Sequence, residues 1–257
     1  MKNKYLFATD LDNTLIHSYK HKKDNDVCIE IYNGKEQGFC SKKTLKLLEE
    51  LKEKILIVPV TARSIEQYKR IEWPEHLIPQ FAVTSNGANL LINGIAEERW
   101  NNEMQEVIKP HISELENLQK YIEENFEQCT SRLTDEAFLV SAFENPVSAA
   151  EAAKKISDIT YLRVDVSMRK VYMFPPELSK GYALERLKER FGCKRIFCAG
   201  DSYNDLDMLK KADYTFVPAD SEIYRLNEYK ADFSNLSDES FSEVMVEKML
   251  NILKNSD

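Results

Sequence analysis

With 257 residues, of which 30% are charged and 43% hydrophobic, the chain has the composition of an ordinary globular protein of one or two domains. Its 35 basic and 43 acidic residues give a net charge of -8, which argues against a nucleic-acid-binding protein because such proteins carry a basic face. The five cysteines form no C-x-x-C pair and no apolar run approaches the roughly 20 residues of a membrane span. We therefore expect a cytoplasmic protein with no zinc site, no disulfide framework and no membrane partner.

The first third of the sequence predicts a parallel sheet with crossover helices. A buried strand is expected at 5–9 and a helix, capped by Ser41, at 42–54. Two further apolar strands are expected at 55–60 and 81–84, with a helix between them. The order strand, helix, strand, helix, strand is typical of an α/β fold.

A hairpin interrupts this pattern between the first strand and its helix. Residues 18–40 contain two short stretches typical of strands around Asn33-Gly34, a dipeptide that favours a tight hairpin turn. Because this segment is longer than a simple loop, we expect it to form a flap over a functional site.

The middle of the chain, 89–178, predicts a separate α+β unit. Helices are expected to begin near Pro110 and Pro146, because proline suits the first turn of a helix. The strands pair with their neighbours along the chain, which is typical of an antiparallel sheet. They are expected at 129–133 with 137–143, and at 161–167 with 170–174.

From Ser179 onward the alternation of helices and strands returns. Helices are expected at 180–191, at 204–212 and from Ser240, and strands at 195–201 and 214–219. The predicted fold is therefore α/β, with a Rossmann-like parallel-sheet core that carries helices on both faces. This core comprises residues 1–88 and 179–257, and the α+β unit with its antiparallel sheet is inserted at 89–178.

Polar side chains follow the strands that we place in the parallel sheet. Asp10 and Asp12 follow the first strand, and Thr61 follows the second. Asp201 follows the strand that begins at residue 195, and Lys180 begins the helix before it. Because ligands bind beyond the carboxyl ends of the strands in open α/β sheets, we expect these side chains to meet in one crevice.

The chemistry of these groups favours phosphoryl transfer. Asp10 and Asp12 repel each other unless a cation lies between them, and they and Asp201 offer the hard oxygen ligands that Mg2+ prefers. Lys180 and the Thr61 hydroxyl can bind phosphoryl oxygens. A carboxylate nucleophile, a second carboxyl group for proton transfer, a metal and a lysine together form a complete site for this reaction.

Four short motifs resemble those of the haloacid dehalogenase-like hydrolase superfamily. They are DLDNT at 10–14, VTAR at 60–63, SKG at 179–181 and GDSYND at 200–205. The unit inserted between the second and third motifs is similar in place to the large type-2 (C2B-like) cap of the Cof-type and sucrose-phosphatase-like branch. Much of the superfamily has glycine where this chain has Asn13, and the asparagine resembles the sucrose-phosphatase-like members.

The resemblance implies a role for each matching residue. Asp10 would be the nucleophile that forms an aspartyl-phosphate, and Asp12 would be the acid and then the base. Mg2+ would be held by the Asp10 side chain, the backbone carbonyl of Asp12 and Asp201. Thr61 and Lys180 would hold the transferring phosphoryl group.

Residues near the motifs leave alternatives open. Arg63 contacts substrate or pairs with an acidic residue, and Asn86 needs left-handed backbone geometry or faces the site. Asn204 and Asp205 either bind the substrate or support the residues of the metal site and Lys180. Four cap side chains bind substrate oxygens or are simply solvated: Arg132, Arg163, Arg169 and Lys170.

The leading hypothesis is a Mg2+-dependent phosphatase that hydrolyses a small phosphorylated metabolite, such as a sugar phosphate, through an aspartyl-phosphate. A mobile cap would close over the substrate and exclude bulk water, so neither proteins nor duplex nucleic acid fit as substrates. One alternative is a phosphomutase acting on a hexose phosphate, and another is a catalytically weak phospholigand-binding protein. A dehalogenase is disfavoured because it would not need Asp12.

Overall fold

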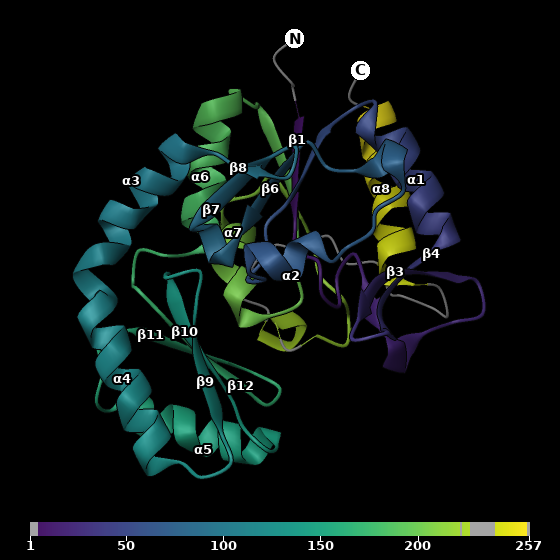
Figure 1. Cartoon of the computed structure of the whole chain (residues 1–257). Coiled ribbons are helices and arrows are strands. Elements are labelled where there is room, and N and C mark those ends of the chain that lie inside the picture. Colours follow the sequence, from purple (N-terminus) through teal and green to yellow (C-terminus); the bar gives the residue numbers. More distant parts are fainter. Residues whose placement is uncertain (1–4, 222, 227–239, 256–257) are drawn as a thin grey trace.

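A four-stranded parallel sheet forms the centre of the core in this computed structural model, which describes residues 5–221, 223–226 and 240–255 (Figure 1). The strand order is β14-β13-β1-β5, and each neighbouring pair is parallel. The strands are β1 (Tyr5–Thr9), β5 (Leu56–Pro59), β13 (Arg195–Ala199) and β14 (Tyr214–Phe216). The predicted α/β core is therefore confirmed.

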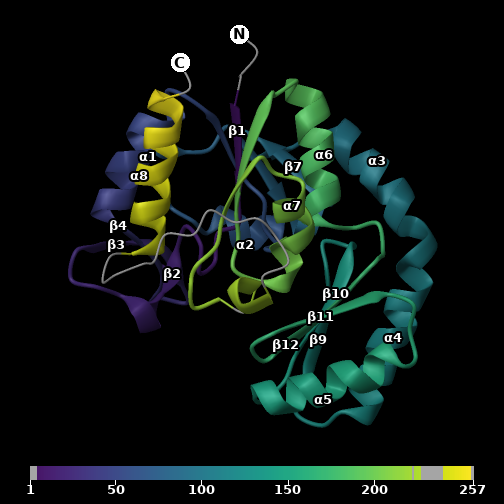
Figure 2. The same cartoon turned by 180° about the vertical axis from the view of Figure 1, so that it is seen from behind.

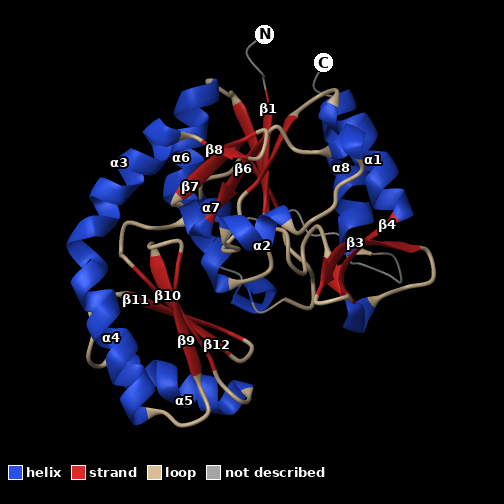
Figure 3. Cartoon of the chain, in the orientation of Figure 1, coloured by secondary structure: helices blue, strands red, loops and turns tan. Residues whose placement is uncertain are grey.

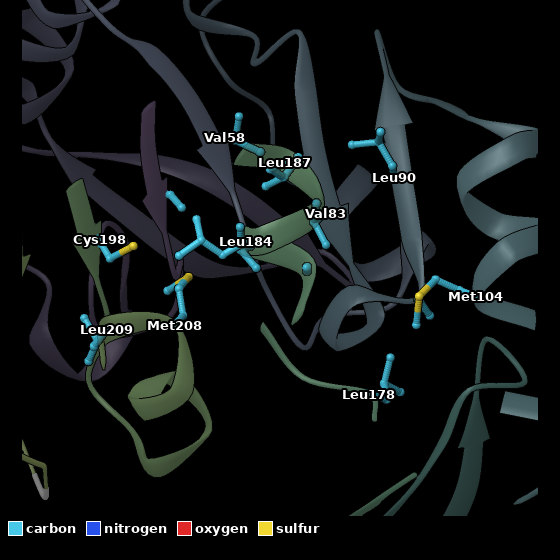
Figure 4. Packing of buried hydrophobic residues seen from close by; sticks show 14 of the residues in the cluster. Val58, Val83, Leu90, Met104, Leu178, Leu184, Leu187, Cys198, Met208 and Leu209 are labelled. Atoms are coloured by element: carbon cyan, nitrogen blue, oxygen red, sulfur yellow. The ribbon is translucent and has the colours of Figure 1, made fainter. Parts of the chain in front are cut away.

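Strand β1 is buried along its whole length because helices cover both faces of the sheet. Its side chains alternate between two buried clusters, with Leu6 and Ala8 in one and Tyr5 and Phe7 in the other. The first cluster, part of which Figure 4 shows, includes side chains of α3 (Glu98–Ile108), α6 (Lys180–Phe191) and α7 (Leu206–Lys210). The second includes α1 (Lys42–Lys52) and α8 (Phe241–Lys254), which lie on the opposite side of β1 (Figures 1 and 2).

The strand predicted at 81–84 makes its regular pairing outside the parallel sheet. β6 (Phe81–Thr84) pairs antiparallel with β7 (Asn89–Ile92), which pairs with β8 (Ile95–Ala96). A parallel bridge between Val60 and Val83 connects β6 to the chain just after β5. β6 pairs with β7 because the tight turn at 85–87 reverses the chain directly after β6. The helix expected before β6 is the short α2 (Ile65–Lys69).

The flap predicted from Asn33-Gly34 is a three-stranded sheet of order β2-β4-β3. Its strands are β2 (His17–Ser18), β3 (Asp26–Tyr32) and β4 (Lys35–Ser41), and we refer to residues 17–41 as the flap. Asn33 and Gly34 both have positive φ, at 52° and 71°, as a tight hairpin turn requires. Ser41 then caps α1 by accepting a hydrogen bond from the Thr44 N–H, as predicted.

The inserted unit is a four-stranded antiparallel sheet covered on one face by two helices (Figure 3). The sheet order is β11-β12-β10-β9, and the predicted strand pairs are both present. Its elements are α4 (Ile112–Asn125), β9 (Thr130–Thr134), β10 (Phe138–Ala142), α5 (Pro146–Ser157), β11 (Arg163–Ser167) and β12 (Lys170–Phe174). Leu139, Val171 and Met173 pack against α4 and α5, so the alternate side chains of these strands point the other way, toward the core.

We propose a later start for the cap domain than residue 89. Strand β7 pairs with β6 of the core, and α3 contributes Trp100, Met104 and Ile108 to the cluster that holds Leu184 and Leu187 of α6. The first element that packs with the antiparallel sheet is α4. The segment 89–108 is therefore better grouped with the core, and the cap with residues from about 112 to 178.

Short 3-10 turns complete the described elements, at Tyr19–His21, Glu75–Leu77, Ser85–Gly87, Lys109–His111, Tyr203–Asp205 and Ile223–Leu226. Among the residues that the structure describes, no helix has the length and apolar character needed to span a bilayer.

Candidate active site

A cavity of about 530 Å³ lies between the carboxyl edge of the parallel sheet, the flap and the open face of the cap sheet. Seven of the residues predicted for the site line this cavity: Asp10, Asp12, Thr61, Arg63, Lys180, Asp201 and Asn204. The other two residues predicted in the core part of the site, Asn86 and Asp205, are fully buried and do not line the cavity. The expected convergence of distant strand ends is therefore present.

The Lys180 ammonium group joins two carboxylates at the floor of the cavity. Its Nζ donates hydrogen bonds of 2.6 Å to Oδ1 of Asp10 and of 2.6 Å to Oδ1 of Asp205. Lys180 is the first residue of α6, where Ser179 caps the helix by accepting from the Tyr182 N–H. Burial lowers the pKa of Lys180, but the two carboxylates outweigh it and raise the pKa, so the ammonium group stays charged.

Asp205 is a structural support for this lysine. Its second oxygen, Oδ2, accepts hydrogen bonds from the N–H of Asp201 (3.2 Å), the N–H of Ser202 (3.0 Å) and the Ser202 hydroxyl (2.9 Å). A Cβ on Gly200 would lie 2.4 Å from the Cβ of Asp205, so this close approach requires glycine. The loop after β13 thus orients Asp205 toward Lys180, as the resemblance implies.

Asp10 and Asp201 are the carboxylates best placed to hold a divalent cation. One oxygen each of Asp10, Asp201 and Asp205 lie within 4.8 Å of one another. Both oxygens of Asp205 already accept hydrogen bonds, so Asp10 and Asp201 are the members of this group that could bind a cation. Burial, and then the neighbouring carboxylates, raise the pKa of Asp10 to about 7 and that of Asp201 to about 8. A hard cation such as Mg2+ fits this oxygen set and would offset the repulsion.

Arg63 holds Asp12 through two hydrogen bonds. Its Nε donates to Oδ2 of Asp12 at 2.8 Å and its Nη2 donates to Oδ1 at 2.7 Å. Arg63 therefore forms the ion pair with an acidic residue that was one of the two alternatives left by the sequence. Loss of water around the carboxyl group raises the pKa of Asp12, but the hydrogen bonds and charge of Arg63 lower it below the ordinary value. Asp12 is therefore ionised in this arrangement.

The flap supplies a carboxylate that the sequence did not reveal as a site residue. Glu30 of β3 is 4% exposed and accepts from Nη2 of Arg63 at 2.9 Å and from Nε of Arg70 at 3.2 Å. The pairing of β3 with β4 shifts register around Glu30, so the alternation of the strand gives no guide to its direction. Gly38 lies opposite, where a Cβ would be 3.0 Å from the Glu30 Cβ.

Asn86, which is buried, and Asn204, which lines the cavity, are joined by a hydrogen bond. Asn86 has φ 59°, the left-handed geometry that one reading of the sequence required. Its Oδ1 accepts from Nδ2 of Asn204 at 2.7 Å, and its Nδ2 donates to the Leu178 carbonyl at 3.3 Å. Oδ1 of Asn204 accepts in turn from Nη2 of Arg163 at 3.1 Å, which connects the core to the cap.

Asn13 shows why an asparagine can stand in the first motif. Its φ is 55°, a conformation that glycine adopts freely and that asparagine tolerates better than most residues. Its Nδ2 donates to Oδ2 of Asp201 at 3.3 Å. The departure from glycine therefore adds a contact to one of the carboxylates that could hold a cation.

A second contact between cap and core comes from the turn between β9 and β10. Asp135 of this turn accepts hydrogen bonds through Oδ2 from the Ile65 N–H at 2.9 Å, from the Ser85 hydroxyl and from Nδ2 of Asn89 at 3.4 Å. Together with the Arg163–Asn204 hydrogen bond, it holds the cap over the cavity. Thr61 lies under this roof, 1% exposed, and its Oγ1 accepts from the Arg63 N–H at 3.1 Å.

The chain was compared with protein-family models and with curated protein sequences. The family model of sucrose-6F-phosphate phosphohydrolase matches residues 3–238, which is most of the chain. No curated protein sequence is significantly similar to the chain.

Solved structures share the fold over almost the whole chain. The sucrose-phosphatase of Synechocystis, in complex with sucrose and phosphate, has 14% identity and a TM-score of 0.63, covering 98% of each chain. A phosphatase of the haloalkanoate superfamily from Bacteroides thetaiotaomicron has 16% identity and a TM-score of 0.61, covering 97% of this chain and 95% of the other. The trehalose-6-phosphate phosphatase of Aspergillus fumigatus has 16% identity and a TM-score of 0.52, covering 98% and 93%.

The four motifs, the two-part fold and the match of the family model point to the same group of enzymes. The chain belongs to the sucrose-6F-phosphate phosphohydrolase family of haloacid dehalogenase-like hydrolases, and it is a phosphoric monoester hydrolase.

Proposed function

We propose that this enzyme hydrolyses a small sugar phosphate with Asp10 as its nucleophile and Mg2+ as its cofactor. One observation carries the proposal: Lys180 holds the Asp10 carboxylate at the floor of a cavity that the cap sheet roofs, with Asp201 beside it. A carboxylate, a buried cation and a second carboxylate in a covered site are what phosphoryl transfer to an aspartate requires.

In the first half-reaction, a carboxylate oxygen of Asp10 attacks phosphorus and the bond from phosphorus to the sugar oxygen breaks. Asp12 gives its proton to that oxygen as it leaves. Arg63 keeps Asp12 ionised before substrate binds, and the negative charge of an arriving phosphoryl group favours uptake of a proton by Asp12. Lys180 fixes the direction of Asp10 through the hydrogen bond to Oδ1.

In the second half-reaction, a water molecule attacks the phosphorus of the aspartyl-phosphate. Asp12, now ionised, takes the proton of that water, and the bond from phosphorus to the Asp10 oxygen breaks to release phosphate. Mg2+, held by the side chains of Asp10 and Asp201 and by the Asp12 carbonyl, would neutralise charge on the phosphoryl oxygens. The Thr61 hydroxyl, at the end of β5 in the lining, would donate to one of those oxygens.

The size and lining of the cavity support a sugar as the leaving group. Its volume of about 530 Å³ lies in the range of small-molecule sites. Its lining combines polar groups with apolar surface such as Tyr172 and Val140, as the two faces of a sugar ring require. The family and the related structures named for sucrose and trehalose phosphates favour the same class.

Phosphate release from a panel of sugar monophosphates tests the proposal. We expect hydrolysis of at least one sugar phosphate that depends on Mg2+ and is lost when a chelator removes the metal. Conversion of a hexose 1-phosphate into the 6-phosphate without free phosphate would instead identify a phosphomutase. Tight binding of the compounds without turnover would identify a binding protein.

A further inference from the structure

We infer that the cap holds a subsite for a second acidic group on the substrate, a carboxylate or a phosphate, formed by Arg132 and Lys170. The inference rests on the proposed function, since it names the class of sugar phosphate that the site takes. It assigns this enzyme a phosphorylated sugar acid or a sugar bisphosphate in place of a neutral sugar phosphate.

The register of the cap sheet brings four side chains into one row above the cavity. Val140 of β10 lies opposite Arg132 of β9 on one side and Tyr172 of β12 on the other, and Tyr172 lies opposite Asp165 of β11. Opposed residues point to the same face of a sheet, and all four line the cavity. Lys170 lies two residues before Tyr172 and so points to the same face.

Arg132 and Lys170, the two cations on this face of the cap sheet, differ in their ion pairing from the other lysines and arginines that line the cavity. Lys180 pairs with Asp10, and Arg63 and Arg70 both pair with Glu30. Within the described part of the chain, neither Arg132 nor Lys170 has a carboxylate within ion-pair distance, although both are exposed to the cavity. The acidic residue of the row, Asp165, is already paired, because its Oδ2 lies 3.1 Å from Nε of Arg163.

Three arginines and the carboxylate of Asp12 contribute to the electrostatic surroundings of Lys170. Partial burial is the main cause that lowers the pKa of Lys170, and the charges of Arg132, Arg169 and Arg63 lower it further against the attraction of Asp12. A bound anion would relieve this repulsion. The donors that the transferring phosphoryl group needs, Lys180 and Thr61, lie on the core side of the cavity, so the roof cations remain for another group.

The row also fits the carbon skeleton that would connect the two acidic groups. Val140 and the Tyr172 ring lie between Asp165 at one end of the row and Arg132 at the other. An aliphatic or ring portion can pack on these two side chains, with a hydroxyl donating to Asp165 and the acidic group accepting from Arg132 and Lys170. Burial raises the pKa of Tyr172 to about 12, so its hydroxyl also remains a donor at neutral pH.

Two pairs of compounds, each differing by one acidic group, test this subsite. Glucitol 6-phosphate and 6-phosphogluconate differ by a carboxylate, and fructose 6-phosphate and fructose 1,6-bisphosphate differ by a phosphate. We expect the acidic member of at least one pair to have the higher kcat/KM. The double variant Arg132→Ala/Lys170→Ala should lose about 10- to 100-fold on that member and less than about threefold on the neutral one, as expected for lost hydrogen bonds to a charged group. Lys154→Ala is the control, because Lys154 is an exposed cation on α5 of the cap and lies outside the cavity lining, and it should leave the ratio unchanged.

Binding to Asp10→Asn, measured by calorimetry with Mg2+, separates this inference from the proposed function. If the wild type released phosphate from none of these four compounds or the wider panel, the proposed function would be contradicted. The affinities of Asp10→Asn for the four compounds, with and without Arg132→Ala/Lys170→Ala, would still test the subsite. Equal affinities within both pairs, or no binding at all, would overturn the inference. An equal loss for acidic and neutral members in the double variant would also overturn it, because the cations would then bind the transferring phosphoryl group.

Discussion

Replacing Asp10 by asparagine is expected to lower the rate of phosphate release by about 10⁴-fold or more, as loss of a nucleophile does in enzymes with covalent catalysis. Asparagine has the shape of aspartate and can still accept the hydrogen bond from Lys180, but its amide is not a nucleophile toward phosphorus. Steady-state release of phosphate, with Mg2+ and the best compound of the panel, measures the effect. The exposed Asp158→Asn is a matched control that changes the same functional group on the cap surface.

The stability of Asp10→Asn distinguishes lost chemistry from lost folding. The raised pKa of Asp10 means that its ionised form is unfavourable in the folded protein without metal. Removing that charge should leave the melting temperature of the metal-free protein unchanged or higher near pH 8. A variant that remains folded and retains a large part of the wild-type rate would remove Asp10 from the nucleophile role.

Replacing Lys180 by methionine is expected to cost about 3–5 kcal/mol of unfolding free energy at neutral pH, as removal of one member of a buried ion pair does. Lys180 is 2% exposed, and the change leaves the carboxylates of Asp10 and Asp205 close together without their shared cation. Activity should also be lost, because Asp10 loses the hydrogen bond that orients it. Urea unfolding curves of the wild type and the variant measure the difference, and the exposed Lys188→Met on the same helix is the control.

The cost of Lys180→Met should depend on pH in a defined direction. The pKa of Asp10 is already raised to about 7 in the wild type, and it rises further without the ammonium group. In both proteins the folded state holds the proton of Asp10 at pH 5, so the deficit of the variant changes little up to about pH 6. It grows as pH rises above 7, where the wild type releases that proton and the variant still holds it. A deficit of the same size at pH 5 and at pH 9 would show that packing, not charge, accounts for the contribution of Lys180 to stability.

The sequence was sufficient for the core and its motifs because each depends on short-range patterns. The apolar runs around β1 and β13 are continuous since helices cover both faces of the sheet, and the polar residues just beyond them meet by topology alone. The hairpin of the flap was predictable for the same reason, because its turn carries Asn33 and Gly34, which tolerate positive φ.

Contacts that depend on register or on docking were beyond the sequence. Glu30 reaches Arg63 because β3 shifts register against β4, and no local pattern indicates such a shift. Asp135 contacts Ile65 and Ser85 only once the cap lies on the core. The boundary of the cap that we propose differs from the one predicted from the sequence, because the sequence of α3 does not indicate that Trp100 packs beside α6.

The most direct measurement is the chemical trapping of a phosphorylated enzyme during turnover. Borohydride reduces an aspartyl-phosphate to homoserine, so protein quenched with borohydride in the steady state can be digested and analysed by mass spectrometry. We expect homoserine at position 10, in the peptide that contains DLDNT, and at no other aspartate; the signal should require both Mg2+ and substrate. Reduction of another aspartate, or phosphate release with no reducible residue in the protein, would contradict an aspartyl-phosphate on Asp10.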